Sequence, residues 1–197
     1  MKVTKEQLLI EALNQFAKED YDRVSLQSIG KALDITKGGV YHYFSSKDDL
    51  FKETVIYIID ILEQVSMGQF DPTRSLKEQL RPFFKLRDTS QMYAQIIGID
   101  FFNDYSVLIT LLFSAIKKFD EVRVRVSRIY TNAIESFTTL FSEAQTLGEI
   151  KSDRNPSVLA FELAALIEGG LLISAVTAID EDLQNNVFED FYGHLST

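Results

Sequence analysis

A short segment near the N-terminus carries the side chains whose types and spacing best fit binding chemistry. It reads Thr-Lys-Gly-Gly-Val-Tyr-His-Tyr-Phe over residues 36–44. Val40 and Phe44 fall on one face at helical spacing, and the other positions are polar, small or aromatic. The polar side chains offer hydrogen-bond donors, and the two glycines let a backbone approach a partner closely. Such a helical face suits the phosphates and base edges of a nucleic acid.

A second short helical pattern precedes this segment. Leu26, Ile29 and Leu33 lie on one face, and Ser25 stands where it can cap the helix, as Thr36 can cap the next one. Only two or three residues separate the two patterns. Helices joined by so short a turn form a helix-turn-helix, in which the second helix enters the DNA major groove while the first crosses the backbone. The pair predicts a DNA-binding protein.

Longer helical patterns flank this pair and must position it. Thr4 and Gln7 make a capping-box start, and the apolar spacing that follows predicts a first helix over 5–19. A fourth helix is expected from Ser46 to about residue 66, linking the DNA-binding part to the rest. Pro82 should kink or shorten a fifth helix. No strand pattern is present, so an all-α fold of about nine or ten helices is expected, with later helices near 89–102, 104–117, 119–147, 156–179 and 183–195.

Charge is distributed unevenly along the chain. The 197 residues carry a net charge of −9. Residues 1–52 hold eight basic and eight acidic side chains, whereas residues 53–197 hold twelve basic and twenty-one acidic ones. The acidity therefore belongs to the second part, and the first part is neutral, with Lys37 and Lys47 beside the proposed reading helix. A nucleic-acid partner is compatible with this distribution.

Missing residues exclude or disfavour several function classes. The chain has no cysteine, which excludes disulfides and thiolate metal sites, and its only histidines are His42 and His194. No metal-ligand spacing, phosphate-binding loop or activated nucleophile is found, so neither catalysis nor a cofactor nor a metal is expected. The N-terminus lacks an apolar signal core, which predicts a cytoplasmic protein. Glu162 and Glu168 interrupt the apolar stretch 159–179, which favours a helix buried in protein over a membrane span.

Together these residues resemble the tetracycline-repressor (TetR) family of bacterial regulators. The resemblance rests on Phe16-Ala17, on residues 25–33 and 36–44, and on the Ser-Ser-Lys-Asp-Asp-Leu sequence over 45–50, and it is specific over about residues 4–52. It implies a homodimer that binds a near-palindromic operator in double-stranded DNA. It also implies a helix-turn-helix DNA-binding domain over 1–46 and a ligand-binding and dimerisation domain over 47–197. A small-molecule effector in the second domain would change the spacing between the two DNA-binding domains of the dimer.

The resemblance assigns the DNA contacts position by position. They lie at the start of the supporting helix (Ser25, Gln27), in the first turn of the recognition helix (Thr36, Lys37, Gly38, Gly39), in its aromatic, phosphate-touching end (Tyr41, His42, Tyr43) and at the start of the fourth helix (Lys47). Alternatives remain: the glycine pair could be loop, the aromatics could be core, and Lys47 could be a solvated charge. Asp34 stands where the family usually has glycine, and aspartate tolerates the left-handed backbone of such a turn.

The second domain contains candidate residues for an effector pocket and for a dimer interface, and their patterns can be interpreted in more than one way. Seven residues could line an effector pocket or belong to the core: Tyr93, Phe101, Phe102, Tyr105, Tyr130, Phe137 and Glu168. The helix around Glu168 has apolar residues on more than one side, which predicts a dimer interface with Leu163, Ala164, Ile167, Gly170 and Leu171. A basic cluster (Lys117, Lys118, Arg123, Arg125, Arg128) is expected to pair with neighbouring acids. The sequence favours a repressor released by its effector; in the alternatives the second domain only dimerises, or the ligand co-represses.

Overall fold

The computed structural model describes residues 3–64, 70–71, 73–86 and 105–196, together with Gln91 and Gln95. These residues form nine α-helices and one 3-10 helix and contain no strand, so the all-α prediction is confirmed. Apart from Gln91 and Gln95, the predicted helix over 89–102 lies outside the described residues. The elements are α1 (Lys5–Lys18), α2 (Leu26–Ala32), α3 (Lys37–Tyr41), α4 (Lys47–Gln64), α5 (Leu76–Leu80), η1 (Arg81–Phe84), α7 (Tyr105–Lys118), α8 (Asp120–Thr146), α9 (Pro156–Ser174) and α10 (Glu181–Ser196).

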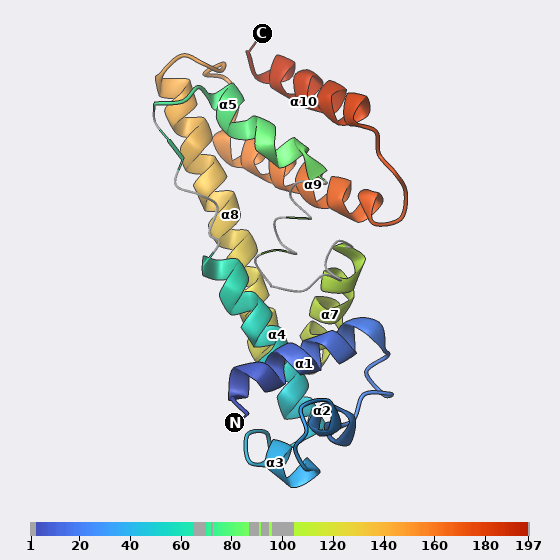
Figure 1. Ribbon diagram of the computed structural model, residues 1–197. Helices are drawn as coiled ribbons and strands as arrows, with labels where there is room; N and C mark the ends of the chain where they lie inside the picture. The colour runs from blue at the N-terminus through green and yellow to red at the C-terminus, as the bar shows by residue number, and fades with distance from the viewer. Residues whose placement is uncertain are drawn as a thin grey trace.

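The helices are arranged along an elongated molecule (Figure 1). Helices α1, α2 and α3 gather at one end, and α5, α9 and α10 lie at the other, where the chain ends. The long helix α8 connects the two ends, with α4 packed on it and on α1, and with α7 alongside. Helix α9 packs extensively on α8. The helix-turn-helix is therefore carried at the tip of a helical body.

Side-chain caps fix the starts of the N-terminal helices. The Thr4 hydroxyl accepts a hydrogen bond from the Gln7 backbone N–H at 3.2 Å, and the Gln7 side chain accepts one from the Thr4 N–H at 2.9 Å. Ser25 and Ser28 make the same reciprocal pair at the start of α2. Thr36 caps α3 through the Gly39 N–H at 3.2 Å. The predicted helix starts are confirmed, because each cap satisfies N–H groups that have no partner inside the helix.

Breaks in the later helices follow proline, glycine and asparagine. Helix α5 ends at Leu80 and continues as a 3-10 turn containing Pro82, as predicted. Gly148 follows α8 with a φ of +74°, a conformation that suits glycine. Asn155 caps α9 by accepting from the Ser157 N–H at 2.9 Å. Helix α9 ends at Ser174, earlier than the expected residue 179.

Two hydrophobic cores are built along the molecule. The first joins α1, α2 and α3, which we call the DNA module, to α4, α7 and α8. It includes Leu13, Ile29, Val40, Ile58, Leu108 and Val122. The second joins α5, η1, α8, α9 and α10 around Leu80, Phe137, Leu163 and Phe188. The helix-turn-helix therefore shares its core with the helices of the larger domain.

Within the described part of the chain, α9 is the one helix long and apolar enough to cross a membrane, by length and composition only. Leu159 and Leu163 on its inner face are fully buried in the second core. Its opposite face is exposed, with Phe161 at 64% of its maximal accessibility. Helix α9 thus packs one face inside its own chain and exposes an opposite, apolar face to solvent.

The turn between α2 and α3 generates a stability prediction. Asp34 has a φ of +54°, which confirms the expected left-handed backbone. We expect Asp34→Val to lower the free energy of unfolding by about 1–2 kcal/mol, because a β-branched side chain is strained in this conformation. Asp34→Gly should cause no such loss. Urea unfolding of both variants measures this, and an equal loss in the two would contradict it.

Candidate nucleic-acid interface and effector site

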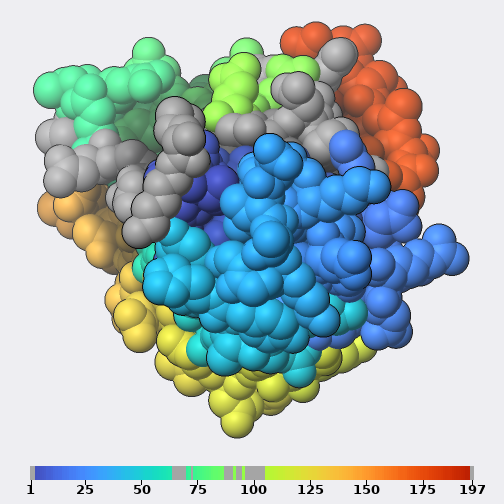
Figure 2. All heavy atoms as spheres, turned by 60° about the horizontal axis from the view of Figure 1, so that its bottom comes forward, coloured from blue at the N-terminus to red at the C-terminus, as the bar shows by residue number. Residues whose placement is uncertain are grey.

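The first turn of α3 is presented to solvent at the tip of the molecule. Figure 2 looks onto this tip, with the residues of α2 and α3 at the centre of the face. Thr36, Lys37 and Gly38 are exposed, whereas Val40 on the inner side is fully buried. The backbone at Gly38 is uncrowded, since a Cβ there would meet only the Thr36 hydroxyl, at 3.7 Å. These residues form an accessible surface through which a partner can approach the backbone closely.

Helix α3 is held against α2 by a close backbone contact. A Cβ on Gly30 would lie 2.9 Å from the carbonyl oxygen of Ile35 and 3.2 Å from a methyl of Val40. A larger residue at Gly30 would therefore push the two helices apart. Ser25 and Gln27, at the start of α2, are exposed on the same module. The α2–α3 unit is thus a rigid pair with exposed polar groups on both helices.

The aromatic residues at the end of α3 have different environments. Tyr41 and His42 are exposed, which argues against the alternative that they are core aromatics. The Lys37 ammonium lies 5.6 Å from the centre of the Tyr41 ring, so the two side chains share one surface. Tyr43 is half-buried, and its hydroxyl donates to the Val3 carbonyl at 2.7 Å. In this structure Tyr43 therefore holds the N-terminal segment, and the phosphate contact expected of it stays a prediction.

Lys47, at the start of α4, makes contacts within the protein. Its ammonium donates to the backbone carbonyls of Tyr21 at 2.9 Å and Val24 at 3.1 Å, and it lies 4.2 Å from the centre of the Tyr21 ring. These contacts tie the α1–α2 loop to the start of α4. In this structure the donors of Lys47 are therefore used within the protein, and the phosphate contact expected of Lys47 stays a prediction.

A second contact at the same loop joins it to α7, and sequence reasoning did not identify it. The Lys118 ammonium lies 2.8 Å from a carboxylate oxygen of Asp48 and 3.7 Å from the centre of the Tyr21 ring. The Tyr21 hydroxyl donates to Asp48 as well. Hydrogen bonds from Lys118 and Tyr21 lower the pKa of Asp48. We call these three residues the Tyr21 contact; it connects the DNA module directly to the larger domain.

Ion pairs also connect α4 to α8. Arg125 pairs with Asp60 at 2.7 Å and with Glu63, and its side chain is only 18% exposed. Arg123 pairs with Asp120 at 3.7 Å. The predicted pairing of the basic cluster with acids is confirmed for Lys118, Arg123 and Arg125. Since Lys118 and Arg125 pair with acids of α4 from two other helices, the cluster also ties α4 to α7 and α8.

The effector candidates divide into three groups. Tyr93, Phe101 and Phe102 lie outside the described residues. Phe137 is fully buried and packs edge-on against Phe83 with ring centres 5.3 Å apart, so the structure places it in the core. The remaining three meet between α7, α8 and α9: Tyr105, Tyr130 and Glu168.

The Tyr105 hydroxyl donates to the Glu168 carboxylate, and Tyr130 is hydrogen-bonded to it as well. Tyr105 is buried, Glu168 is half-buried and Tyr130 is 37% exposed. Burial raises the pKa of Glu168, while the two hydrogen bonds act in the opposite direction. One carboxylate is therefore surrounded by phenols contributed by two other helices.

The dimer candidates face inward more than expected. Leu163 and Leu171 are buried in the chain's own cores, Ile167 packs against both cores, and Ala164 is half-buried. A Cβ on Gly170 would lie 3.0 Å from Leu86. The periodicity of α9 did not show which side packs inward, because the helix is apolar all round, and the dimer interface itself stays a prediction. The exposed apolar residues of α9 lie on another face: Phe161, Leu166, Leu172 and Ile173.

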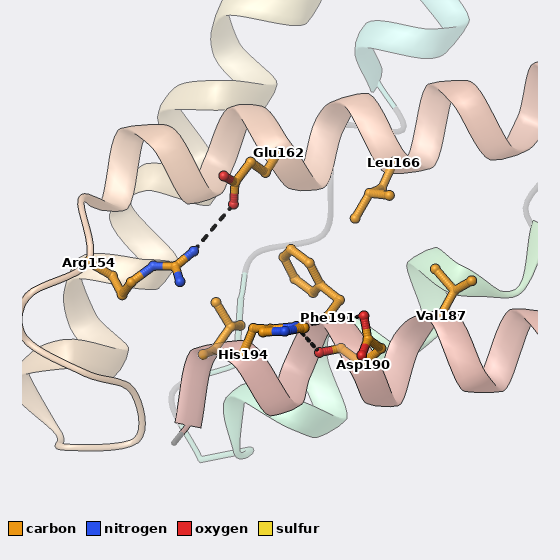
Figure 3. A pocket seen from close by; sticks show the side chains of 8 residues that line it. Arg154, Glu162, Leu166, Val187, Asp190, Phe191 and His194 are labelled. Carbon is orange, nitrogen blue, oxygen red and sulfur yellow. Dashed lines mark hydrogen bonds and ion pairs between the residues drawn. The ribbon is translucent and has the colours of Figure 1, made fainter.

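Figure 3 shows a groove between α9 and α10, next to this exposed face. The groove has a volume of about 270 Å³. Leu166 and Phe191 line its apolar part. Its ends carry an ion pair between Arg154 and Glu162 at 3.6 Å and a contact between His194 and the backbone of Asp190 at 2.8 Å. The groove thus adds a mixed polar and apolar border to the exposed side of α9.

Comparison with known proteins identifies both parts of the chain. A model described as bacterial regulatory proteins of the tetR family matches residues 4–54, and a tetracyclin repressor-like C-terminal domain matches residues 107–187. The HTH-type transcriptional repressor DhaR of Mycobacterium sp. (strain GP1) is 27% identical over 165 residues, covering 80% of this chain and 75% of DhaR.

Two solved structures share the fold. GusR of Salmonella enterica has a TM-score of 0.67 and 21% identity over the full length of both chains. A putative transcriptional regulator from Saccharomonospora viridis, solved in complex with choline, has a TM-score of 0.73 and 17% identity over 96% of this chain and 95% of that one. With both family models matched and the exposed helix-turn-helix in place, this chain belongs to the TetR family of helix-turn-helix transcriptional regulators, which are not enzymes.

Proposed function

We propose that this protein acts in the cytoplasm as a homodimeric repressor that leaves its operator when a small molecule binds the larger domain. The observation that carries the proposal is the exposed first turn of α3, with Thr36, Lys37 and Gly38 outward and Val40 fixed in the core. DhaR, which resembles the chain over four-fifths of its length, is a repressor. Repression needs only stable occupation of DNA, which this surface supports.

Base and phosphate contacts are assigned to the exposed residues of the α2–α3 unit. Among the described residues Lys37 makes no ion pair, so its ammonium is available to guanine acceptors or to a phosphate. Tyr41, His42, Ser25 and Gln27 offer further donors toward the DNA backbone. In the DNA complex of a two-fold dimer, the two copies of α3 should lie one helical turn apart, about 34–36 Å.

Dimerisation is assigned to the exposed apolar face of α9 and the neighbouring α10. Phe161, Leu172 and Ile173 are each more than half exposed, which is unfavourable for an isolated chain in water. Ala165 and Gly169 lie on the same side and let a partner helix approach closely. A two-fold interface that places this face on its own copy would bury all of these side chains at once.

Coupling between effector and operator is assigned to α4, α7 and the Tyr21 contact. An effector changes DNA affinity only by binding the competent and incompetent arrangements with different affinity. Helix α7 begins at Tyr105 and ends at Lys118, which contacts Asp48 and Tyr21. A displacement of α7 would therefore move Tyr21 and Asp48, which lie beside the helix-turn-helix.

The two lysines near the reading helix should behave differently when they are removed. Lys37→Ala should weaken operator binding and leave the midpoint of thermal unfolding unchanged, because its side chain is exposed. Lys47→Ala should lower both, because three backbone carbonyls of the α1–α2 loop lose their donor. Fluorescence anisotropy with operator DNA and thermal denaturation measure the two effects. The assignment fails if Lys37→Ala leaves operator affinity intact.

The proposed interface predicts which glycine of α9 tolerates a charge. A Cβ at Gly169 meets nothing within 4 Å, so Gly169→Glu should fold normally and shift the dimer toward monomer. The exposed Ser142 of α8 supplies a matched control, Ser142→Glu, which should remain dimeric. Sedimentation at micromolar concentration distinguishes the species. A monomeric unmodified protein, or a dimeric Gly169→Glu variant, would contradict the interface.

Loss of the Tyr21 contact should reduce the coupling between effector binding and operator binding. Lys118→Met removes the ion pair with Asp48, whereas Lys117→Met changes an exposed neighbour and serves as the control. With an effector found by thermal-shift screening, the native protein should lose operator affinity by a factor that corresponds to about 1–3 kcal/mol. In Lys118→Met this factor should shrink toward one. An unchanged factor would show that coupling bypasses Lys118.

A further inference from the structure

Glu168 is a half-buried carboxylate whose hydrogen-bond partners are phenols, whereas two other half-buried carboxylates are ion-paired. Glu63 is paired with Arg125, and Glu53 lies 2.9 Å from the ammonium of Lys5. Glu168 is hydrogen-bonded to the phenols of Tyr105 and Tyr130. In the part of the chain that the structure describes, no lysine, arginine or histidine forms an ion pair with it.

A half-buried carboxylate of this kind is held in an unfavourable state. Removal from water destabilises an anion, and neutral hydrogen bonds offset only part of that cost. Burial is the largest influence on Glu168 and raises its pKa. A positive charge placed beside the carboxylate would stabilise the anion, whereas a negative one would be repelled. The site is therefore selective for the sign of a ligand's charge.

We propose that Glu168, Tyr105 and Tyr130 bind the charged group of an organic cation, so that the effector of this regulator is an amine or a quaternary ammonium compound. This inference rests on the proposed function, in which a small molecule releases the operator. The carboxylate supplies the counter-charge, and the phenols supply acceptor oxygens and ring faces that attract cations. Tyr130 is partly exposed, so the site has a solvent-accessible side.

The three residues come from three helices, which connects binding to regulation. Tyr105 is the first residue of α7, and Lys118 of the Tyr21 contact is the last. Tyr130 belongs to α8, which holds α4 through Arg125. A cation bound among these three residues would displace α7, α8 and α9 relative to one another. That displacement lies on the route to the helix-turn-helix.

Calorimetric titration with matched probes tests the site. Choline and benzyltrimethylammonium serve as cations, and 3,3-dimethylbutan-1-ol is the neutral isostere of choline. We expect the native protein to bind the cations at least ten-fold more tightly than the isostere. Glu168→Gln keeps the size of the side chain but removes its charge, and it should weaken cation binding at least ten-fold. Glu143→Gln removes an exposed charge from α8 and should bind as the native protein does.

A second variant keeps the test decisive if Glu168→Gln fails to fold. Tyr130→Leu removes a partly exposed ring and should also weaken cation binding, with less effect on the isostere. The inference is overturned if neither cation binds, or if both bind native protein and Glu168→Gln equally. Operator titrations separate the two claims. Release by the isostere and not by the cations would overturn the cation site and leave the proposed function standing. Glu168-dependent cation binding without any change in operator affinity would support the site and contradict effector release.

Discussion

The structure depends on one hydrophobic core that the DNA-binding helices do not form alone. Leu13, Ile29 and Val40 of the helix-turn-helix pack in the same cluster as Ile58 of α4 and Leu108 of α7. A three-helix unit of this length buries too little apolar surface to be stable by a wide margin on its own. The helix-turn-helix therefore depends for its support on α4 and α7 as well as on α1 and α2.

This shared core gives the larger domain a mechanical means of acting on DNA affinity. Packed interiors are dense, so helices that share a core move as bodies and do not deform locally. The polar contacts at the edge of the core, made by Lys118 and Arg125, connect α7 and α8 to the first and last turns of α4. A ligand that shifts α7 against α8 would therefore reposition the reading helix without touching it.

Sequence reasoning succeeded where a pattern had a single solution. Helices α1 to α4 are apolar on one side and start at capping residues, so their positions and inner faces followed from spacing. Sequence reasoning failed to identify the outer face of α9. The helix is apolar all round, so the spacing of its apolar residues does not show which side faces the core. The role of Lys47 depends on carbonyls more than twenty residues away, at Tyr21 and Val24, which no local pattern shows. Phe137 and Tyr130 have the same helical spacing and differ only in what packs against them.

Native-state hydrogen exchange tests the shared core most directly. If the core is one cooperative unit, the slowest amides of α1 to α3 and those of α4 and α7 should open with the same free energy, and should lose protection together as urea is added. Substitution of the buried Leu108 in α7 by alanine should then lower protection in α2 and α3 as well. If α1 to α3 open at a distinctly lower free energy, and do not respond to Leu108→Ala, the DNA module folds independently and the account is contradicted.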